Sequence, residues 1–337
     1  MAASVGVKHH MCILTARRGI MFNPELKERF IQESNYTEAR EKFARWLFDN
    51  TGKYEEQWGA DICTQPIETV RPAIDAVIGI KHRSFTSAIA YLYRYCEWCL
   101  ANGVENATDA LLQIRAPSND KFKTQMISSP AHLQEYLNAL FEPESHKRID
   151  NTYRCYFWLA YSGMPEDDIF LIKSSDIDFL HMIVKYNDNE YPIYEQALPA
   201  MMNCVILSAF ASTAGYLPKD NQFIQRGEGN ILIRGTKPSA SKGTLKPLIS
   251  KLMAHAIKNG RTEQKLTYNK VWLSGLFFRM HERELEGYKV SFMSFSAWQL
   301  TQKYKDDPKR EATVIEIRKK SHEYLSDYKR WKEAFDI

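Results

Sequence analysis

Residues 154–179 read RCYFWLAYSGMPEDDIFLIKSSDIDF, and this stretch decides the fold. Tyr153, Tyr156, Phe157 and Ala160 recur at the spacing of one helix face, which predicts a helix. A glycine lies near the centre of the stretch, and glycine readily adopts the positive φ that is common at helix C-termini. We therefore expect a helix, a glycine turn and a second element to follow one another here.

A proline and three acids come directly after this turn. Pro165 suits the first position of a second helix, where its missing N–H costs nothing. Glu166, Asp167 and Asp168 would then lie in the first turn, where the helix dipole favours negative charge. A carboxylate pair is the alternative for the two aspartates, but adjacent helix residues diverge by about 100°. A strand is expected to begin at Phe179.

The composition is that of an ordinary globular protein. With 337 residues, of which 44% are hydrophobic, two domains are expected. No apolar run approaches the roughly 18–20 residues that a membrane helix needs, so no membrane partner is expected. The six cysteines are scattered, and Cys96-x-x-Cys99 has no second pair to complete a zinc site. Free thiols of this kind indicate the cytoplasm.

Residues 22–115 read as one small all-helical domain, because no alternating strand pattern occurs before residue 178. Asn35 is the expected N-cap of its first helix, and Gly52 is expected to stop that helix. Four helices are predicted, at residues 35–50, 67–80, 84–102 and 107–114.

Residues 116–129 have the composition of a linker and carry Lys121 and Lys123. The second domain, 130–337, begins with a helix-start signal at Pro130. It contains one hairpin pattern, with strands at 182–186 and 191–194 around Asn187-Asp188-Asn189, and a short strand at 231–233. Helices are expected at residues 195–211, 244–259, 267–286, 295–304 and 310–335.

The order helix, glycine, helix, aspartate and strand resembles the first catalytic box of the tyrosine recombinase (phage integrase) family. The resemblance implies a mainly α, two-domain architecture, with a SAM-like core-binding domain followed by a helical catalytic-like domain with a small β-hairpin. In that family the residue two after the glycine is an arginine that holds the scissile phosphate. Here that residue is Pro165.

A second stretch, LSGLFFRMHERELEG at 273–287, resembles the second box of the family. The resemblance places the family's histidine at Val271, its second arginine at Ser274 and its second histidine at Gly275. Lys185 is the candidate for the family's hairpin lysine. Tyr324 and Tyr328 are the candidates for its tyrosine nucleophile.

Strand cleavage needs guanidinium groups to neutralise the transition state, and losing one such donor costs on the order of 10²–10³ in rate. Two arginines and a histidine are replaced in this chain. The resemblance therefore implies a catalytically inactive protein with no cofactor and no small-molecule substrate.

Positive charge is concentrated in residues 231–270, which hold nine Lys/Arg and one acid, so that the rest of the chain is net negative. Such a segment suits double-stranded DNA, and its loop 236–244 suits a phosphate. A solvated lysine face is the alternative. The candidate DNA-binding residues are Lys81, Arg83, Lys121, Lys123, Arg234, Lys237, Ser239, Ser241, Lys242, Lys246 and Arg261.

Three smaller features have plain interpretations. Residues 1–21 hold three Lys/Arg and no acid, which indicates a flexible extension or an upstream start, with a basic DNA-binding arm as the alternative. His9-His10 and the run 281–284 lack the spacing of metal ligands, so no metal site is expected. Residues 323–331 predict a docking helix, packed on this chain or on a second copy.

Loss of the catalytic residues within this frame resembles the MrpR group of recombinase-like master repressors of SPbeta-type Bacillus prophages. The resemblance implies a sequence-specific DNA-binding repressor that maintains lysogeny of a temperate phage by occupying operator elements in the bacterial nucleoid. Its protein partners would be a second copy of the chain or other phage regulators. The alternatives are an accessory recombination protein that acts through protein contacts, and an active, divergent integrase.

Overall fold

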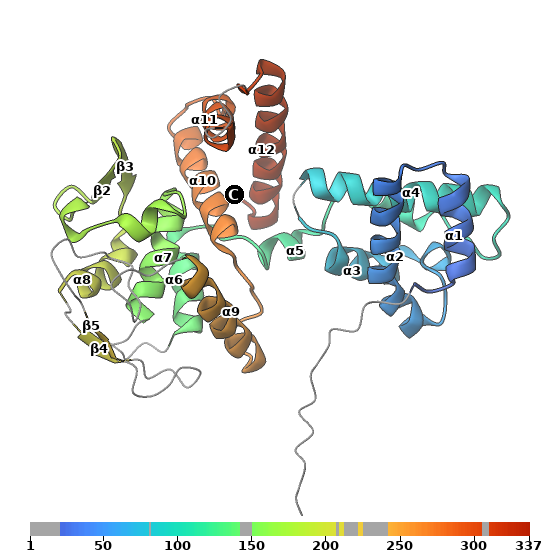
Figure 1. Cartoon of the computed structure of the whole chain (residues 1–337), viewed down its shortest axis with the longest axis horizontal. Coiled ribbons are helices and arrows are strands. Elements are labelled where there is room, and N and C mark those ends of the chain that lie inside the picture. The colour runs from blue at the N-terminus through green and yellow to red at the C-terminus, as the bar shows by residue number, and fades with distance from the viewer. Residues whose placement is uncertain are drawn as a thin grey trace, which may run out of the picture. The chain divides into compact units, whose positions relative to one another are not determined.

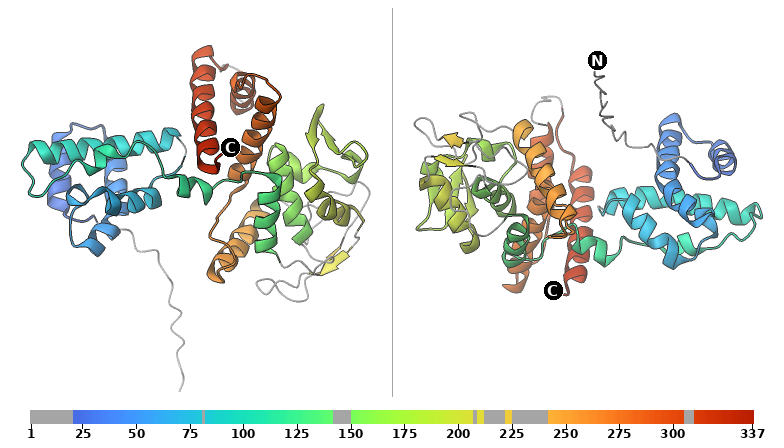
Figure 2. Two further views of the ribbon diagram at one scale, coloured as in Figure 1. Left: turned by 180° about the vertical axis from the view of Figure 1, so that it is seen from behind. Right: turned by 90° about the horizontal axis from the view of Figure 1, so that it is seen from below.

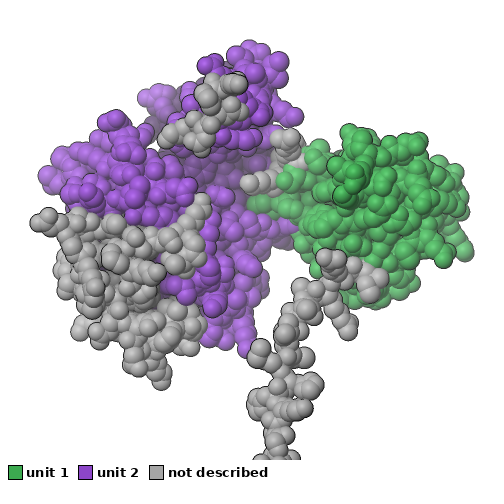
Figure 3. Space-filling model, in the orientation of Figure 1, with its two compact units in different colours: residues 1–118 green, residues 119–337 purple. Residues whose placement is uncertain are grey.

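The computed structural model describes residues 21–80, 82–141, 150–206, 209–211, 222–224, 242–304 and 310–337. The chain forms two compact units, residues 1–118 and 119–337 (Figure 3). Among the described residues, no helix is long and apolar enough to cross a membrane. Each unit is described by itself below.

The front unit is helical throughout its described part (Figure 1). Its core joins residues from every helix, including Phe30, Leu47, Ile74 and Leu92, none of which is more than 1% exposed. Its elements are α1 (Pro24–Glu33), α2 (Glu38–Trp58), η1 (Ile62–Thr64), α3 (Ile67–Val77), α4 (His82–Ala101) and η2 (Ala110–Gln113).

Two predictions for the front unit were wrong. Helix α2 begins after Thr37 and not at Asn35, and it runs through Gly52 to Trp58, where Gly59 (φ 65°) ends it. Gly52 is buried in the helix, so packing overrides its weak helix propensity. Helix α1 was not predicted. The expected fourth helix is the short 3-10 turn η2.

The back unit is also mainly helical, as the views from behind and from below in Figure 2 show. The predicted mainly α class with a small sheet is confirmed. Its helices are α5 (Asn119–Lys123), α6 (Pro130–Leu140), α7 (Asp150–Ser162), α8 (Leu198–Ile206), α9 (Lys242–Lys258), α10 (Tyr268–Leu285), α11 (Met293–Tyr304) and α12 (Val314–Phe335).

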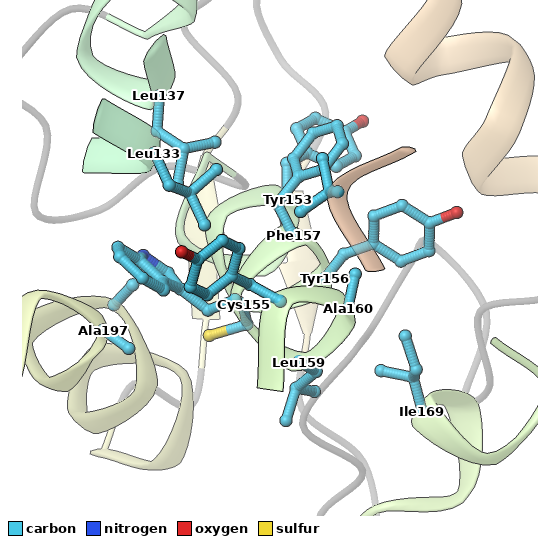
Figure 4. Packing of buried hydrophobic residues seen from close by; sticks show 14 of the residues in the cluster. Leu133, Leu137, Tyr153, Cys155, Tyr156, Phe157, Leu159, Ala160, Ile169 and Ala197 are labelled. Carbon is cyan, nitrogen blue, oxygen red and sulfur yellow. The ribbon is translucent and has the colours of Figure 1, made fainter. Parts of the chain in front are cut away.

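Helix α7 is the centre of this unit, and every one of its residues except Arg154 is buried. Tyr153 and Phe157 project into a core that includes Leu133 and Leu137 of α6 (Figure 4). The helix predicted around residues 153–160 is therefore confirmed. Its residues are buried on nearly all sides because neighbouring elements cover most of the helix.

The predicted hairpin is confirmed. Strands β1 (Ile177–Asp178), β2 (Ile183–Tyr186) and β3 (Asn189–Pro192) form an antiparallel sheet in that order. Asn187 (φ 47°) and Asp188 (φ 58°) form the two-residue turn, where both positions need the left-handed conformation that Asn and Asp tolerate.

The remaining predictions for this unit have mixed outcomes. The segment after Pro165 is a turn followed by the 3-10 helices η3 (Asp168–Leu171) and η4 (Ser174–Asp176), not an α-helix, and the first strand starts at Ile177. One turn is enough to bury the neighbours Ile169 and Phe170. The helix expected over 195–211 is divided into η5 (Glu195–Ala197), α8 and the strand β4 (Ala209–Ala211), which pairs with β5 (Gln222–Ile224). The strand expected at 231–233 lies outside the described residues.

Candidate functional site

Side chains of α10 hold the chain where α7 ends. Three backbone carbonyls between residues 161 and 164 each accept a hydrogen bond from a side chain of α10. Arg279 Nη1 donates to Tyr161 O, Trp272 Nε1 donates to Gly163 O over 2.9 Å, and the Tyr268 hydroxyl donates to Met164 O. The frame of the first box is thus fixed by the helix that carries the second box.

Two glycines permit this close crossing. Gly163 has φ 100°, and a Cβ atom there would lie 2.6 Å from Arg279 Nη2. A Cβ atom at Gly275 would lie 1.8 Å from Tyr161 O, which is backbone and cannot move aside. Larger residues are therefore excluded at both positions, and at Gly275 most strictly.

The position of the family's second arginine has a structural task in this protein. Ser274 is fully buried, and its hydroxyl accepts a hydrogen bond from Ile127 N over 2.9 Å and donates to Lys270 O over 2.8 Å. Trp331 Nε1 of α12 donates to Ile127 O over 2.9 Å. The peptide groups on both sides of Ile127 are thus bound by α10 and α12.

The resemblance places two further catalytic groups at Val271 and Pro165, and neither residue has a side-chain donor. Val271 is fully buried in the core of the back unit. Pro165 is half-buried at the surface of the turn after α7 and has neither charge nor N–H.

Neither candidate tyrosine is poised to attack. The Tyr324 hydroxyl donates to Gln299 Oε1 over 2.6 Å, and the Tyr328 hydroxyl donates to Glu284 Oε2 over 2.6 Å. Burial raises the pKa of both phenols above the ordinary tyrosine value. Both phenols therefore favour the protonated form, with their hydroxyls bound within the chain.

Lys185 lies on β2 and is exposed. Its Nζ is 3.5 Å from Asp178 Oδ2, to which His181 Nδ1 also lies close at 2.8 Å. Hydrogen bonds from the His181 backbone and ring, with a smaller contribution from Lys185, lower the pKa of Asp178 to about 2. Lys185 is thus a surface cation with a carboxylate partner.

A carboxylate stands directly beside Pro165. Glu166 is 9% exposed at its side chain. Its Oε1 accepts a hydrogen bond from the Tyr156 hydroxyl over 2.6 Å, and its Oε2 lies 3.0 Å from Lys246 Nζ on α9. Where the resemblance puts a guanidinium for phosphate, the chain therefore has a fixed negative charge.

The candidate DNA-binding residues are placed unevenly by the structure. Lys81, Arg234, Lys237, Ser239 and Ser241 lie outside the described residues. Arg83 and Lys242 lie in α4 and α9, but their side chains are not described. Lys121 and Lys123 lie in α5, within the predicted linker, and Arg261 lies half-buried after α9.

One of these cations, Lys123, lies near the loop that joins α9 to α10. Gln264 Nε2, in the loop between α9 and α10, donates to Lys123 O over 2.9 Å, so α5 lies against this loop. Lys123 is exposed, as are Lys251, Lys258 and Lys265. We call these four residues and Lys246 the basic edge of the back unit. The roles of all candidate DNA-binding residues stay predictions.

Sequence reasoning missed the residues that hold the box frame. Tyr268, Trp272, Gly275 and Arg279 are spaced by four, three and four residues, so they share one face of α10. This periodicity is the available signal, but the neighbouring face of α10, with Leu276 and Phe277, is more apolar and equally periodic. No sequence signal points to the partnership of Glu166 with Lys246.

A metal site requires a group of ligand side chains close together. Among the residues that the structure describes, no group of three or more His, Cys, Asp or Glu could hold a metal ion. Cys96 and Cys99 are buried and free, as predicted, and so are Cys63, Cys155 and Cys204. Cys12 lies outside the described residues.

Residues 21–101 match a family model of core-binding domains, so this part of the front unit is similar to that class of helical domain. The model is described as "MrpR, N-terminal core-binding domain", and its match covers less than half of the chain. The resemblance predicted from the sequence is confirmed for this unit. No curated protein matches the chain.

Several solved structures are similar over most of the chain. XerA recombinase shares 14% identity at a TM-score of 0.40, over 93% of this chain and 98% of that one. The Tn1549 transposon integrase in complex with circular intermediate DNA shares 13% identity at 0.33, over 88% and 97%. A lambda integrase dimer bound to a COC' core site shares 14% at 0.30, over 87% and 98%. All three TM-scores are low, so the family match is the stronger finding.

Proposed function

We propose that the protein is a sequence-specific DNA-binding repressor that keeps a recombinase-like frame and does not cleave DNA. One observation carries this proposal: the positions that the family uses for chemistry serve other purposes here. Ser274 and Val271 are core residues, and the hydroxyls of Tyr324 and Tyr328 are bound to Gln299 and Glu284. A frame maintained in this way without its chemistry supports a binding function.

DNA is the partner that the charge distribution favours. Phosphate contacts need cationic and hydroxyl side chains and do not need the catalytic set. The basic edge presents exposed lysines from three segments of the back unit. We propose that these lysines fix the register on the duplex, while other side chains read base edges in the major groove.

The biological role that we propose is maintenance of lysogeny in a temperate phage, by occupation of operator elements. The MrpR-type core-binding domain in residues 21–101 supports this role. The role requires the bacterial cytoplasm and nucleoid. It is compatible with a second copy of the chain that binds DNA beside the first.

We propose domain limits of 22–115 and 130–337 with the linker 116–129, although residues 119–123 form α5 within the back unit.

Genome-wide DNA capture with the purified protein tests the proposal. A repressor is expected to recover a small set of related sites with affinity that falls steeply with salt. Neutralising Lys237, Lys242 and Lys246 together should weaken binding to all sequences and lessen the slope of log K against log salt by about 0.9 for each lost phosphate contact. An unchanged slope would place the DNA elsewhere on the protein.

Two other functions make different predictions. An active integrase would form a covalent adduct on a nicked suicide substrate, and the adduct would be lost in Tyr324→Phe or Tyr328→Phe. An accessory protein that acts through protein contacts would bind DNA weakly when alone, and its basic edge would be dispensable. Capture of specific sites without an adduct separates the repressor from both.

A further inference from the structure

We propose that Glu166 is an intramolecular competitor for DNA phosphate, which holds Lys246 in the unbound protein and reduces its affinity for DNA. This inference rests on the proposed function. It assigns to the residue after Pro165 a role in setting how strongly the basic edge binds.

The contact has an asymmetric geometry. Glu166 is largely buried, and Tyr156 Oη binds its Oε1 at 2.6 Å, so the carboxylate is held in place. Lys246 is half-exposed, at 49% of its side chain, and its Nζ lies 3.0 Å from Glu166 Oε2. The lysine is therefore the partner that can move, since its long side chain already faces solvent.

A carboxylate and a phosphate compete for the same group. Both present anionic oxygens to which an ammonium group donates hydrogen bonds at short distances. A phosphate that reaches Lys246 has two options. It either replaces Glu166 as the partner of the ammonium group, or it lies close to the Glu166 carboxylate, which has the same sign of charge. Each option makes the binding free energy of the phosphate contact less favourable. Lys246 is thus a weakened cation of the basic edge, and its carboxylate partner is closer and more buried than the exposed Asp336, whose Oδ2 lies 4.0 Å from Lys123 Nζ.

Lys251 on the same helix is a lysine without such a carboxylate and serves as the comparison for Lys246. Five residues along α9, it points about 140° away from Lys246. It is exposed, and no carboxylate lies in ion-pair distance of it within the described part of the chain. The two lysines differ mainly in the presence of Glu166.

The variant Glu166→Gln tests the proposal, because the amide keeps the shape and can still accept from Tyr156. Binding would be measured by fluorescence anisotropy on a labelled duplex that carries a fragment recovered by genomic capture. Affinity is expected to rise roughly threefold to tenfold, the effect of one exposed charge interaction. Glu263→Gln is the matched control, since Glu263 is an exposed acid in the same basic segment and has no ion pair in the described structure. Its effect should be smaller.

A double-mutant cycle connects the effect to Lys246. In a Lys246→Ala background, Glu166→Gln should change affinity no more than Glu263→Gln does. A wild-type protein that recovers no fragment would overturn the proposed function itself. Binding by the wild type with equal effects of the two Gln variants would overturn only this inference, as would a Glu166→Gln gain that survives Lys246→Ala.

Discussion

Two regions of the back unit differ in the exposure of their polar groups. One region is the contact between α10 and α12, and the other is the basic edge around α9. In the first region, Ser274, Tyr324 and Tyr328 are buried, and each hydroxyl is bound within the chain. In the second region, Lys251, Lys258 and Lys265 are exposed. The first region holds the chain together, and the second remains available to a partner.

This difference bears on how a frame can lose chemistry and keep binding. A catalytic residue must be reachable by substrate, whereas a residue that supports packing must not be. In the function that we propose, residues that serve the core stand at the reactive positions, so the first requirement no longer applies to them. The phosphate-contacting surface is then the part that still needs solvent exposure.

The largest effect is expected from Trp331→Ala. Trp331 is fully buried, contacts the rings of Tyr328 and Phe277 at 6.0 Å between centroids, and donates to Ile127 O. Its removal leaves a cavity and an unpaired carbonyl, with an expected loss of about 3–5 kcal/mol in the free energy of unfolding. Urea denaturation measures this loss. Trp298→Ala, at a site 40% exposed, should cost much less, and equal costs would contradict the description of α12 as a core helix.

A smaller loss is expected from Ser274→Ala. The buried N–H of Ile127 would lose its acceptor, which costs about 1–3 kcal/mol. Ser296 provides a matched control, because it is equally buried but its hydroxyl has no hydrogen-bond partner among the described residues. Ser296→Ala should therefore be neutral or slightly stabilising. If the two variants lose the same stability, Ser274 does not hold the Ile127 segment.

Removal of the two phenolic hydroxyls should lower the free energy of unfolding at neutral pH by a still smaller amount. It should also change how that free energy depends on pH above about 10. Tyr324→Phe and Tyr328→Phe each lose one hydrogen bond, worth about 1 kcal/mol. Because burial raises the folded-state pKa of both phenols, their contribution is fully present below the unfolded value of about 10 and decreases as the pH rises above it. Unfolding of the double variant at pH 8 and at pH 10.5 should therefore show a shallower alkaline loss than the wild type. An identical loss in both proteins would mean that neither phenol is protected.

The sequence predicted the elements whose signals are local. Helix α7 follows from its spacing of apolar residues, and the hairpin follows from Asn187 and Asp188 in one turn. Helix α2 continues through Gly52 because neighbouring residues cover the glycine. The helix propensity of glycine alone does not include this packing. The site depends on distant pairs in the same way: Ser274 and Ile127 are 147 residues apart, and Trp331 and Ile127 are 204 apart. Loss of chemistry was predicted from single positions and stays a prediction, whereas the contacts that those positions make could not be predicted from the sequence.

The smallest effect is expected from Lys185→Ala. Lys185 shares features with both regions, the α10–α12 contact and the basic edge. Lys185 is exposed like the lysines of the basic edge, yet the resemblance places it at a catalytic position, and Asp178 lies 3.5 Å away. Its pair is solvent-exposed, so the urea midpoint should not change measurably. The slope of log K against log salt for DNA should also stay unchanged, because Asp178 offsets the charge that a phosphate would neutralise. Lys251→Ala, with no such carboxylate within the described structure, should lower that slope by about 0.9. A lowered slope for Lys185→Ala would mean that the hairpin contacts DNA, and the surface that remains available would then extend from α9 to β2.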